Sequence, residues 1–209
     1  MTFAELQSAV RTEMHESGTE FYSDQDIKDA INDGYAEMAD ATEFYERQWN
    51  VLMLKWRTYY DLSTILPDTF LSPRRCWSNQ AQWWLQPSNP LEMDRHTFAQ
   101  WELTKGAPDR YWMRGNWWLG VFPKTSTEGG TIIRFVGTAI PTAMSDSTDV
   151  PAFPREFHRG LVEYAKYDLY AQQRETKKSL AEWKIYSQYQ AALAGFVEGR
   201  TSLAEVRIV

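Results

Sequence analysis

The residues whose types could support chemistry are few and scattered along the chain. His15, His96 and His158 stand far apart, without an H-x-x-x-H spacing or companion cysteines, so the sequence predicts no zinc site. Cys76 is the only cysteine, which leaves it no partner for a disulfide or a thiolate metal site and suits a reducing compartment. We expect these four side chains to serve packing, capping or the surface.

Three aspartates near residue 25 resemble the start of a calcium loop. However, Lys28 fills the fifth position of the loop that would begin at Asp24 and continue with Asp26, and Asp29 stands where glycine is required. Acids here suit instead the start of a helix, where the helix dipole is positive. The chain also lacks glycine-rich phosphate motifs and a G-x-S-x-G elbow. The sequence therefore predicts no catalytic residue, metal or cofactor, although a carboxylate pair for hydrolysis stays open because its separation is three-dimensional.

Composition and charge narrow the class of protein. The 209 residues can bury a substantial core in one domain, or in a compact body with one insertion. No apolar run approaches twenty residues and the N-terminus has no secretory signal, so we expect no membrane role and no export. The net charge of −6 is concentrated in residues 1–50, which carry −9. That distribution predicts no tight binding to nucleic acid, which requires clustered Lys and Arg.

Two predicted helices open the chain and position its acids. Thr2 and Glu5 match a capping box, after which apolar residues recur at spacings of three and four until Gly18. A second amphipathic helix is predicted over residues 23–48, begun by a cap at Ser23. Its polar face, which would ordinarily be a solvated surface, carries Asp29, Asp33, Glu37 and Asp40.

A β-rich segment follows, in which β-branched and aromatic runs are broken by Pro, Gly, Asn and Asp. The expected strands are residues 51–60, 83–85, 110–113, 117–122 and 131–136, with a helical turn over 94–101. Gly115 and Asn116 supply the positive φ that a tight hairpin between 110–113 and 117–122 needs. Eight of the ten tryptophans lie between Trp56 and Trp118, and the sequence leaves open whether they form core or contact surface.

Helical periodicity returns after a polar linker. One helix is predicted from Pro154 to about residue 174, and another from residue 176 until Gly199 ends it. The apolar residues of the remaining tail are Leu203, Val206, Ile208 and Val209. Two interpretations of this tail stay open: a strand that closes the chain's own sheet, or an arm that adds to a partner.

Together these elements predict an α+β fold. Residues 1–48 and 152–198 should form an antiparallel helical bundle. An aromatic-rich antiparallel β domain is inserted at 49–140, followed by a linker at 141–151, and a tail at 199–209 ends the chain.

Several runs of residues carry a resemblance to a known family. YSDQDI at 22–27 and AINDGY at 30–35 mark the second helix, GAPDRY at 106–111 and Phe122-Pro123 mark the β segment, and PAFP at 151–154 precedes the return helices. The opening resembles that of head-to-tail adaptor proteins of tailed bacteriophages. The later runs resemble the β insertion and return helices of the adaptors of short-tailed phages.

The resemblance implies a non-enzymatic virion protein that forms a ring, typically of twelve copies, beneath the portal in the neck of the particle. It implies a portal protein and tail or nozzle proteins as partners, DNA passing through the bore without specific binding, and assembly in the host cytoplasm. A cyclic ring requires two different complementary patches on each subunit.

The resemblance also suggests roles for three sets of residues. Portal binding is expected of Leu203, Val206, Ile208 and Val209. The residues expected to line the DNA channel are Asp29, Asp33, Glu37 and Asp40. Contact with a neighbouring subunit or the tail is expected of Trp83, Trp84, Trp117 and Trp118.

Two other classes of function compete with an adaptor. Exposed tryptophans would also suit a carbohydrate-binding module or a virion receptor-binding protein. A hydrolase with a carboxylate pair ranks third. The flanking helices count against both, because a sugar-binding sandwich needs no acidic helical body.

Overall fold

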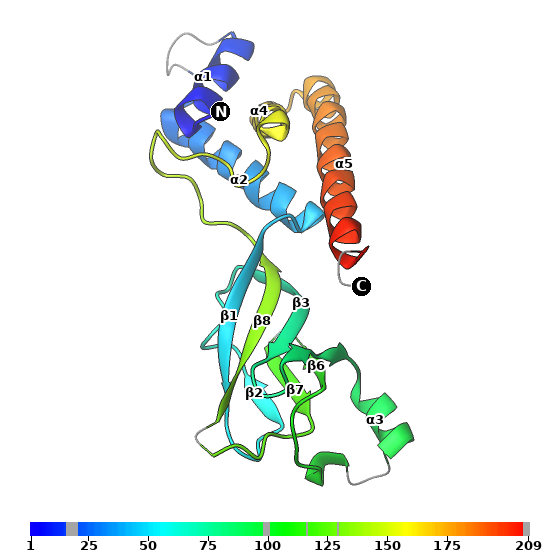
Figure 1. The fold of residues 1–209 in the computed structure, drawn as a ribbon. Helices are drawn as coiled ribbons and strands as arrows, with labels where there is room; N and C mark the ends of the chain where they lie inside the picture. The colour runs from blue at the N-terminus through cyan, green and yellow to red at the C-terminus, as the bar shows by residue number, and fades with distance from the viewer. Residues whose placement is uncertain (16–20, 98–100, 116, 129, 207–209) are drawn as a thin grey trace. The chain divides into compact units, whose positions relative to one another are not determined.

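The structure, a computed structural model, divides into two compact units (Figure 1). It describes residues 1–15, 21–97, 101–115, 117–128 and 130–206, and of residues 96, 97 and 201–206 the backbone only. The helical unit comprises residues 1–45 and 140–209, and the β unit comprises residues 46–139. The two sheets lie in the β unit and the longer helices lie in the helical unit, and the predicted α+β class is confirmed.

The described residues of the helical unit form four α-helices. They are α1 (Phe3–Glu13), α2 (Asp24–Thr42), α4 (Arg159–Gln172) and α5 (Thr176–Val206), with a short 3-10 helix at Arg155–Phe157 before α4. The capping box predicted for α1 is present: the Thr2 hydroxyl accepts from the Glu5 amide, and the Glu5 carboxylate accepts from the Thr2 amide. Ser23 and Asp26 form an equivalent capping box for α2. Both helices therefore begin as predicted.

Two helices end at different residues from those predicted. The helix expected to reach residue 48 ends at Thr42, because Glu43 adopts a left-handed conformation with φ of 48°. The helix expected to end at Gly199 continues to Val206. A Cβ at Gly195 or Gly199 would meet nothing within 4 Å, so both lie on the open side of α5. Glycine weakens a helix but does not by itself stop one.

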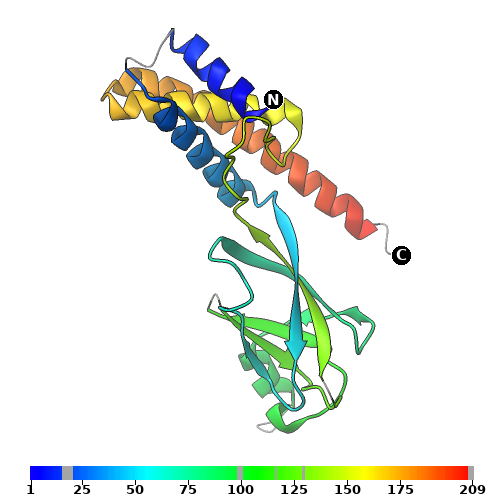
Figure 2. The same ribbon diagram turned by 90° about the vertical axis from the view of Figure 1, so that its left-hand side faces the viewer.

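A single apolar core holds the helical unit together. In this unit α4 packs against both α5 and α2, and α1 packs against α4 (Figure 2). The fully buried side chains of the core include Phe3, Leu6, Ile27, Ile31, Met38, Leu161, Val162, Leu169, Tyr186 and Leu193. They come from all four helices at helical spacings, as expected for amphipathic helices that share one core.

The predicted linker is fastened to the helical unit. The Asn32 side chain donates to the Met144 carbonyl at 3.1 Å and accepts from the Met144 amide at 2.8 Å. The Tyr35 hydroxyl accepts from the Ala152 amide at 2.8 Å. In addition, the first amide of α1, that of Phe3, donates to the carbonyl of residue 149 at 2.7 Å. The segment therefore serves as a strap that satisfies amides at the start of α1.

Within its described residues, the β unit contains two four-stranded sheets. The first has the order β1-β8-β3-β4, and its strands are β1 (Glu46–Met53), β8 (Thr131–Ala139), β3 (Phe70–Ser78) and β4 (Trp83–Trp84). The second has the order β2-β7-β6-β5, and its strands are β2 (Tyr59–Asp61), β7 (Trp118–Phe122), β6 (Arg110–Arg114) and β5 (Gln86–Pro87). The helix α3 (Pro90–Thr97) and the 3-10 helix Trp101–Leu103 lie between β5 and β6.

Several strand predictions need correction. The single strand expected over 51–60 is two strands, β1 and β2, separated by a turn in which Trp56 has φ of 63°. The insertion is not wholly antiparallel, because β5 pairs in parallel with β6. The helical turn expected over 94–101 begins earlier, since α3 starts at Pro90. The predicted hairpin of β6 and β7 is present with Gly115 at φ of 60°, whereas Asn116 lies outside the described residues.

The two sheets pack face to face over a shared core. The first sheet contributes Val51, Met53, Cys76, Ile133 and Phe135, and the second contributes Tyr60, Tyr111, Leu119 and Val121. A smaller cluster of Met93, Trp101 and Trp112 covers part of the outer face of the second sheet. Because side chains alternate along a strand, the residues between the core positions point to the two outer faces of this sandwich.

Candidate assembly surfaces

The acidic face of α2 is extended by a residue from α4. Asp29, Asp33 and Asp40 are exposed and Glu37 is half-buried. Burial raises the pKa of Asp33, and the charges of Asp168 in α4 and of Asp29 raise it further. We call these five carboxylates the acidic face. Asp168 was not among the predicted residues, because its spacing places it beside the apolar stripe of its helix.

A glycine allows α4 to approach α2 at this face. A Cβ at Gly34 would lie 2.7 Å from Cδ1 of Tyr164, so the Tyr164 ring packs directly on the backbone of α2. Burial, followed by the nearby carboxylates of the acidic face, raises the pKa of Tyr164 to about 12. Tyr164 therefore stays neutral at pH 7 and adds no charge to the acidic face.

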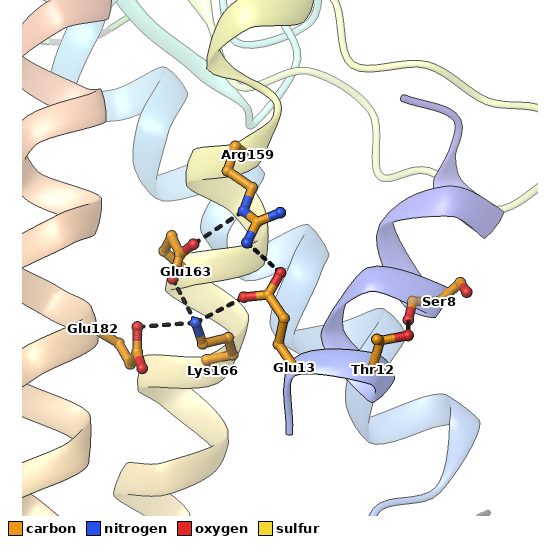
Figure 3. Close-up of polar contacts among 7 residues, drawn as sticks. All are labelled: Ser8, Thr12, Glu13, Arg159, Glu163, Lys166 and Glu182. Carbon is orange, nitrogen blue, oxygen red and sulfur yellow. Dashed lines mark hydrogen bonds and ion pairs between the residues drawn. The ribbon is translucent and has the colours of Figure 1, made fainter. Parts of the chain in front are cut away.

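A network of five charged side chains joins α1, α4 and α5 (Figure 3). At its centre, Lys166 Nζ lies 2.7 Å from Glu163 Oε2 and 3.0 Å from both Glu13 Oε2 and Glu182 Oε2. Arg159 donates to Glu163 Oε1 at 3.1 Å and also pairs with Glu13. Both Lys166 and Glu163 are buried, so the centre of the network lies between the helices, and loss of either partner would leave the other charge buried and unpaired.

The charges in this network do not balance. Burial disfavours the charge of Lys166, but hydrogen bonds to three glutamates outweigh burial and raise its pKa. Burial also opposes the charge of Glu163, yet hydrogen bonds from Lys166, Glu182 and Arg159 lower the pKa of Glu163. For Glu182 burial prevails and raises the pKa. Three carboxylates thus share two cations, and Glu182 keeps a proton more readily than Glu163.

His158 is held by hydrogen bonds within the helical unit. His158 is buried, and its Nε2 lies 2.9 Å from the Phe153 carbonyl while its Nδ1 lies 2.7 Å from the terminal amine of Met1. Because a carbonyl only accepts and an ammonium only donates, Nε2 carries the proton and the ring is neutral. Burial is the main cause that lowers the pKa of His158. His15 is exposed, and only the backbone of His96 is described. In the described ranges no cluster of three or more His, Cys, Asp or Glu residues could hold a metal ion.

The four tryptophans predicted to make contacts divide between the two sheets. Trp83 and Trp84 form β4 at the edge of the first sheet and are 49% and 38% exposed. Trp118 lies in β7 of the second sheet and is 44% exposed, whereas Trp117 is half-buried against the core. The exposed rings therefore do not make one flat platform of the kind that a sugar ring stacks on.

Trp118 lines a hollow on the second sheet. The hollow has a volume of about 400 Å³ and is lined by Tyr59, Arg114 and Trp118. The Tyr59 hydroxyl is 3.3 Å from Glu102, and burial is the main cause that raises the pKa of Tyr59. Tyr, Trp and Arg are the residue types that contribute most to protein interfaces, and neither Tyr59 nor Arg114 was among the predicted site residues.

Two of the four residues predicted to bind the portal lie at the end of α5. Leu203 and Val206 belong to the helix by their backbone, and their side chains are not described. Ile208 and Val209 lie outside the described residues. No helix in the described chain combines the length and apolar character that a membrane span requires.

The whole chain can be compared with known protein families. Residues 1–207 match the family model described as SU10 adaptor protein. The match spans both the helical unit and the β unit, so neither unit alone accounts for it. A search of curated proteins found no match.

Proposed function

The chain belongs to the SU10 adaptor protein family, and on that premise we propose that it forms a ring that joins the phage portal to the tail. Membership makes the protein a structural component of the virion. The proposed ring is dodecameric, as in the adaptors that the sequence resembles, and it occupies the neck of the particle. The observation that carries the proposal is the match over nearly the full length of the chain, across both units.

The mass of the complex with portal tests whether the protein forms a ring. Full-length protein would be mixed with purified portal rings, and the complex measured by sedimentation or native mass spectrometry. We expect a complex whose number of adaptor copies matches the symmetry of the portal. A single copy on each portal, or no complex at concentrations well above those of assembly, would contradict the proposal.

The acidic face suits a channel through which DNA slides. Its carboxylates from α2 and α4 lie on one surface and repel phosphate, so DNA would pass without being held. We propose that Asp29, Asp33, Glu37 and Asp40 line the bore. Exchanging these four residues for Asn or Gln should leave assembly intact and slow the ejection of DNA.

The matched control removes exposed acids from other places. Asp68→Asn, Asp146→Asn, Glu156→Gln and Glu198→Gln together remove four charges outside the acidic face and should leave ejection unchanged. If the four-residue variant ejects DNA at the normal rate, the channel assignment is wrong. The portal test above is unaffected by that outcome.

The end of α5 is the proposed portal contact. Deletion of residues 203–209 removes Leu203, Val206, Ile208 and Val209, whereas Leu193, a core residue of α5, lies upstream. We expect the shortened protein to keep its helical circular dichroism and to lose portal in a pull-down. Recovery of portal with the shortened protein would refute this contact.

A further inference from the structure

The outer face of the first sheet carries a row of side chains across all four strands, of which Trp77 is half-buried and the others are exposed. Asn50 in β1 lies opposite Arg134 in β8, which lies opposite Trp77 in β3, which lies opposite Trp84 in β4. The Trp77 and Trp84 rings meet edge to face at 5.3 Å between centroids. The row thus combines two aromatic rings with a guanidinium on an open sheet surface.

Further apolar and cationic side chains adjoin this row. Leu52 and Ile132 are cross-strand partners and are 54% and 40% exposed. The Arg75 guanidinium lies over the Trp84 ring at 4.3 Å from its centroid. We define the first-sheet patch as Leu52, Arg75, Trp77, Trp84, Ile132 and Arg134. The patch includes two guanidinium groups and no carboxylate.

The outer face of the second sheet carries a different row. Asp61 in β2 lies opposite Trp118 in β7, which lies opposite Arg114 in β6. Tyr59 and Glu102 adjoin this row, and the hollow of about 400 Å³ lies among Tyr59, Arg114 and Trp118. We define the second-sheet patch as these five residues. The patch contains two carboxylates and one guanidinium around an aromatic hollow.

The two patches differ in shape and charge, and they lie on opposite faces of one sandwich. A head-to-tail ring contact needs two different complementary patches on each subunit, and the proposed ring therefore calls for such a pair. Leu52 and Ile132 are exposed on the first-sheet patch, whereas the second-sheet patch contains a hollow. The first-sheet patch has two guanidinium groups and no carboxylate, and the second-sheet patch has two carboxylates and one guanidinium, so the two patches are complementary in charge. Two first-sheet patches placed together would instead oppose four guanidinium groups.

We infer that the first-sheet patch of one copy docks on the second-sheet patch of the next copy around the ring. This inference rests on the proposed ring and names the surfaces through which neighbours meet. In the contact, Arg75 and Arg134 face Asp61 and Glu102 of the neighbouring copy. The Trp, Tyr and Arg side chains of both patches then form the buried centre of the interface.

Two charge-reversed variants test the contact. The first, Arg75→Glu with Arg134→Glu, makes the first-sheet patch negative. The second, Asp61→Lys with Glu102→Lys, makes the second-sheet patch positive. Each variant alone brings like charges together, so the concentration needed for half-maximal ring formation on portal should rise about tenfold or more.

Mixing the two variants should restore rings. In an alternating ring every contact pairs a positive patch with a negative one, so assembly should return close to the wild-type concentration. Misfolding of either variant could not be repaired by the other, which separates this effect from lost stability. As a matched control, Arg174→Glu with Lys177→Glu reverses exposed charges in the helical unit and should assemble normally.

The outcomes distinguish a failure of the proposed patch contact from a failure of the proposed ring. Rings formed by wild type and equally by each variant alone would overturn the docking of the two patches and leave the ring standing. Weakened variants that stay weakened when mixed would also overturn it. If wild type itself forms no ring on portal, the proposed function fails and this inference falls with it.

Discussion

Replacing Lys166 by methionine should strongly destabilise the helical unit. Lys166 Nζ contacts the carboxylates of Glu13, Glu163 and Glu182 within 3.0 Å. Methionine keeps much of the buried volume but leaves the half-exposed guanidinium of Arg159 as the network's remaining cation. Removing one partner of a buried ion pair costs about 3–5 kcal/mol, and we expect the loss to fall in this range.

Glu182→Gln is the matched control for this change. Burial already raises the pKa of Glu182, so the charge of its carboxylate is disfavoured in the folded protein. Glutamine keeps the shape and a polar oxygen near Lys166, and it leaves two carboxylates to balance two cations. We expect the free energy of unfolding to change by less than about 1 kcal/mol.

The assay is urea unfolding followed by circular dichroism at 222 nm, where the long helices dominate the signal. In the Lys166→Met protein Glu163 stays buried without its lysine partner, so the folded pKa of Glu163 should rise above the unfolded value of about 4.3. The loss should therefore be largest at pH 7 and shrink as the pH falls toward that value. A loss below about 1 kcal/mol at pH 7, or one equal at pH 7 and pH 5, would refute the reasoning.

Three further experiments test other features of the fold. Gly34→Ala would place a Cβ 2.7 Å from Tyr164 Cδ1 and should lower the free energy of unfolding by about 1–3 kcal/mol. A Cβ at Gly195 would meet nothing within 4 Å, so Gly195→Ala should raise the free energy of unfolding by up to about 1 kcal/mol. A melting temperature higher for Gly34→Ala than for Gly195→Ala would contradict this. Burial lowers the pKa of His158, so the free energy of unfolding should fall as the pH drops below the unfolded pKa of about 6.5. Urea unfolding at pH 8 and pH 5.5 should show this fall in the wild-type protein and not in His158→Gln. Cys76 is buried with a pKa raised well above its usual value, so a maleimide should modify it only after unfolding, and rapid labelling of the native protein would show that its burial is wrong.

Helix starts could be predicted because their signals are local. Both capping boxes depend on residues three positions apart, Thr2 with Glu5 and Ser23 with Asp26, and both are present. Helix ends were harder. Nothing in the residue type of Glu43 shows that it will adopt a left-handed conformation, and the apolar spacing continues past it. Gly199 has the residue type of a helix end but lies within α5.

Strand pairing could not be predicted from the sequence. The alternation of residues indicates strands, but β8 pairs with β1 and β3, whose residues lie far away along the chain. These pairings decide which side chains share an outer face, so the two patches of the β unit cannot be recognised without the structure. The strand pairings also place Trp84 and Trp118 in different sheets, although both lie in the tryptophan-rich segment of the sequence.

The charged network was missed for a similar reason. Lys166 and Glu13 are 153 residues apart and meet only because α1 packs against α4. A partial signal was available, since Glu163 and Lys166 lie among the apolar residues of a predicted helix. Buried charges at such positions require partners, and the sequence does not say which residues supply them.

Electron microscopy of the protein bound to its portal tests the central claim most directly. We predict an annulus on the narrow end of the portal, with the symmetry of the portal and an open bore faced by α2. A portal whose end carries no added density, or carries one asymmetric copy, would contradict the adaptor ring.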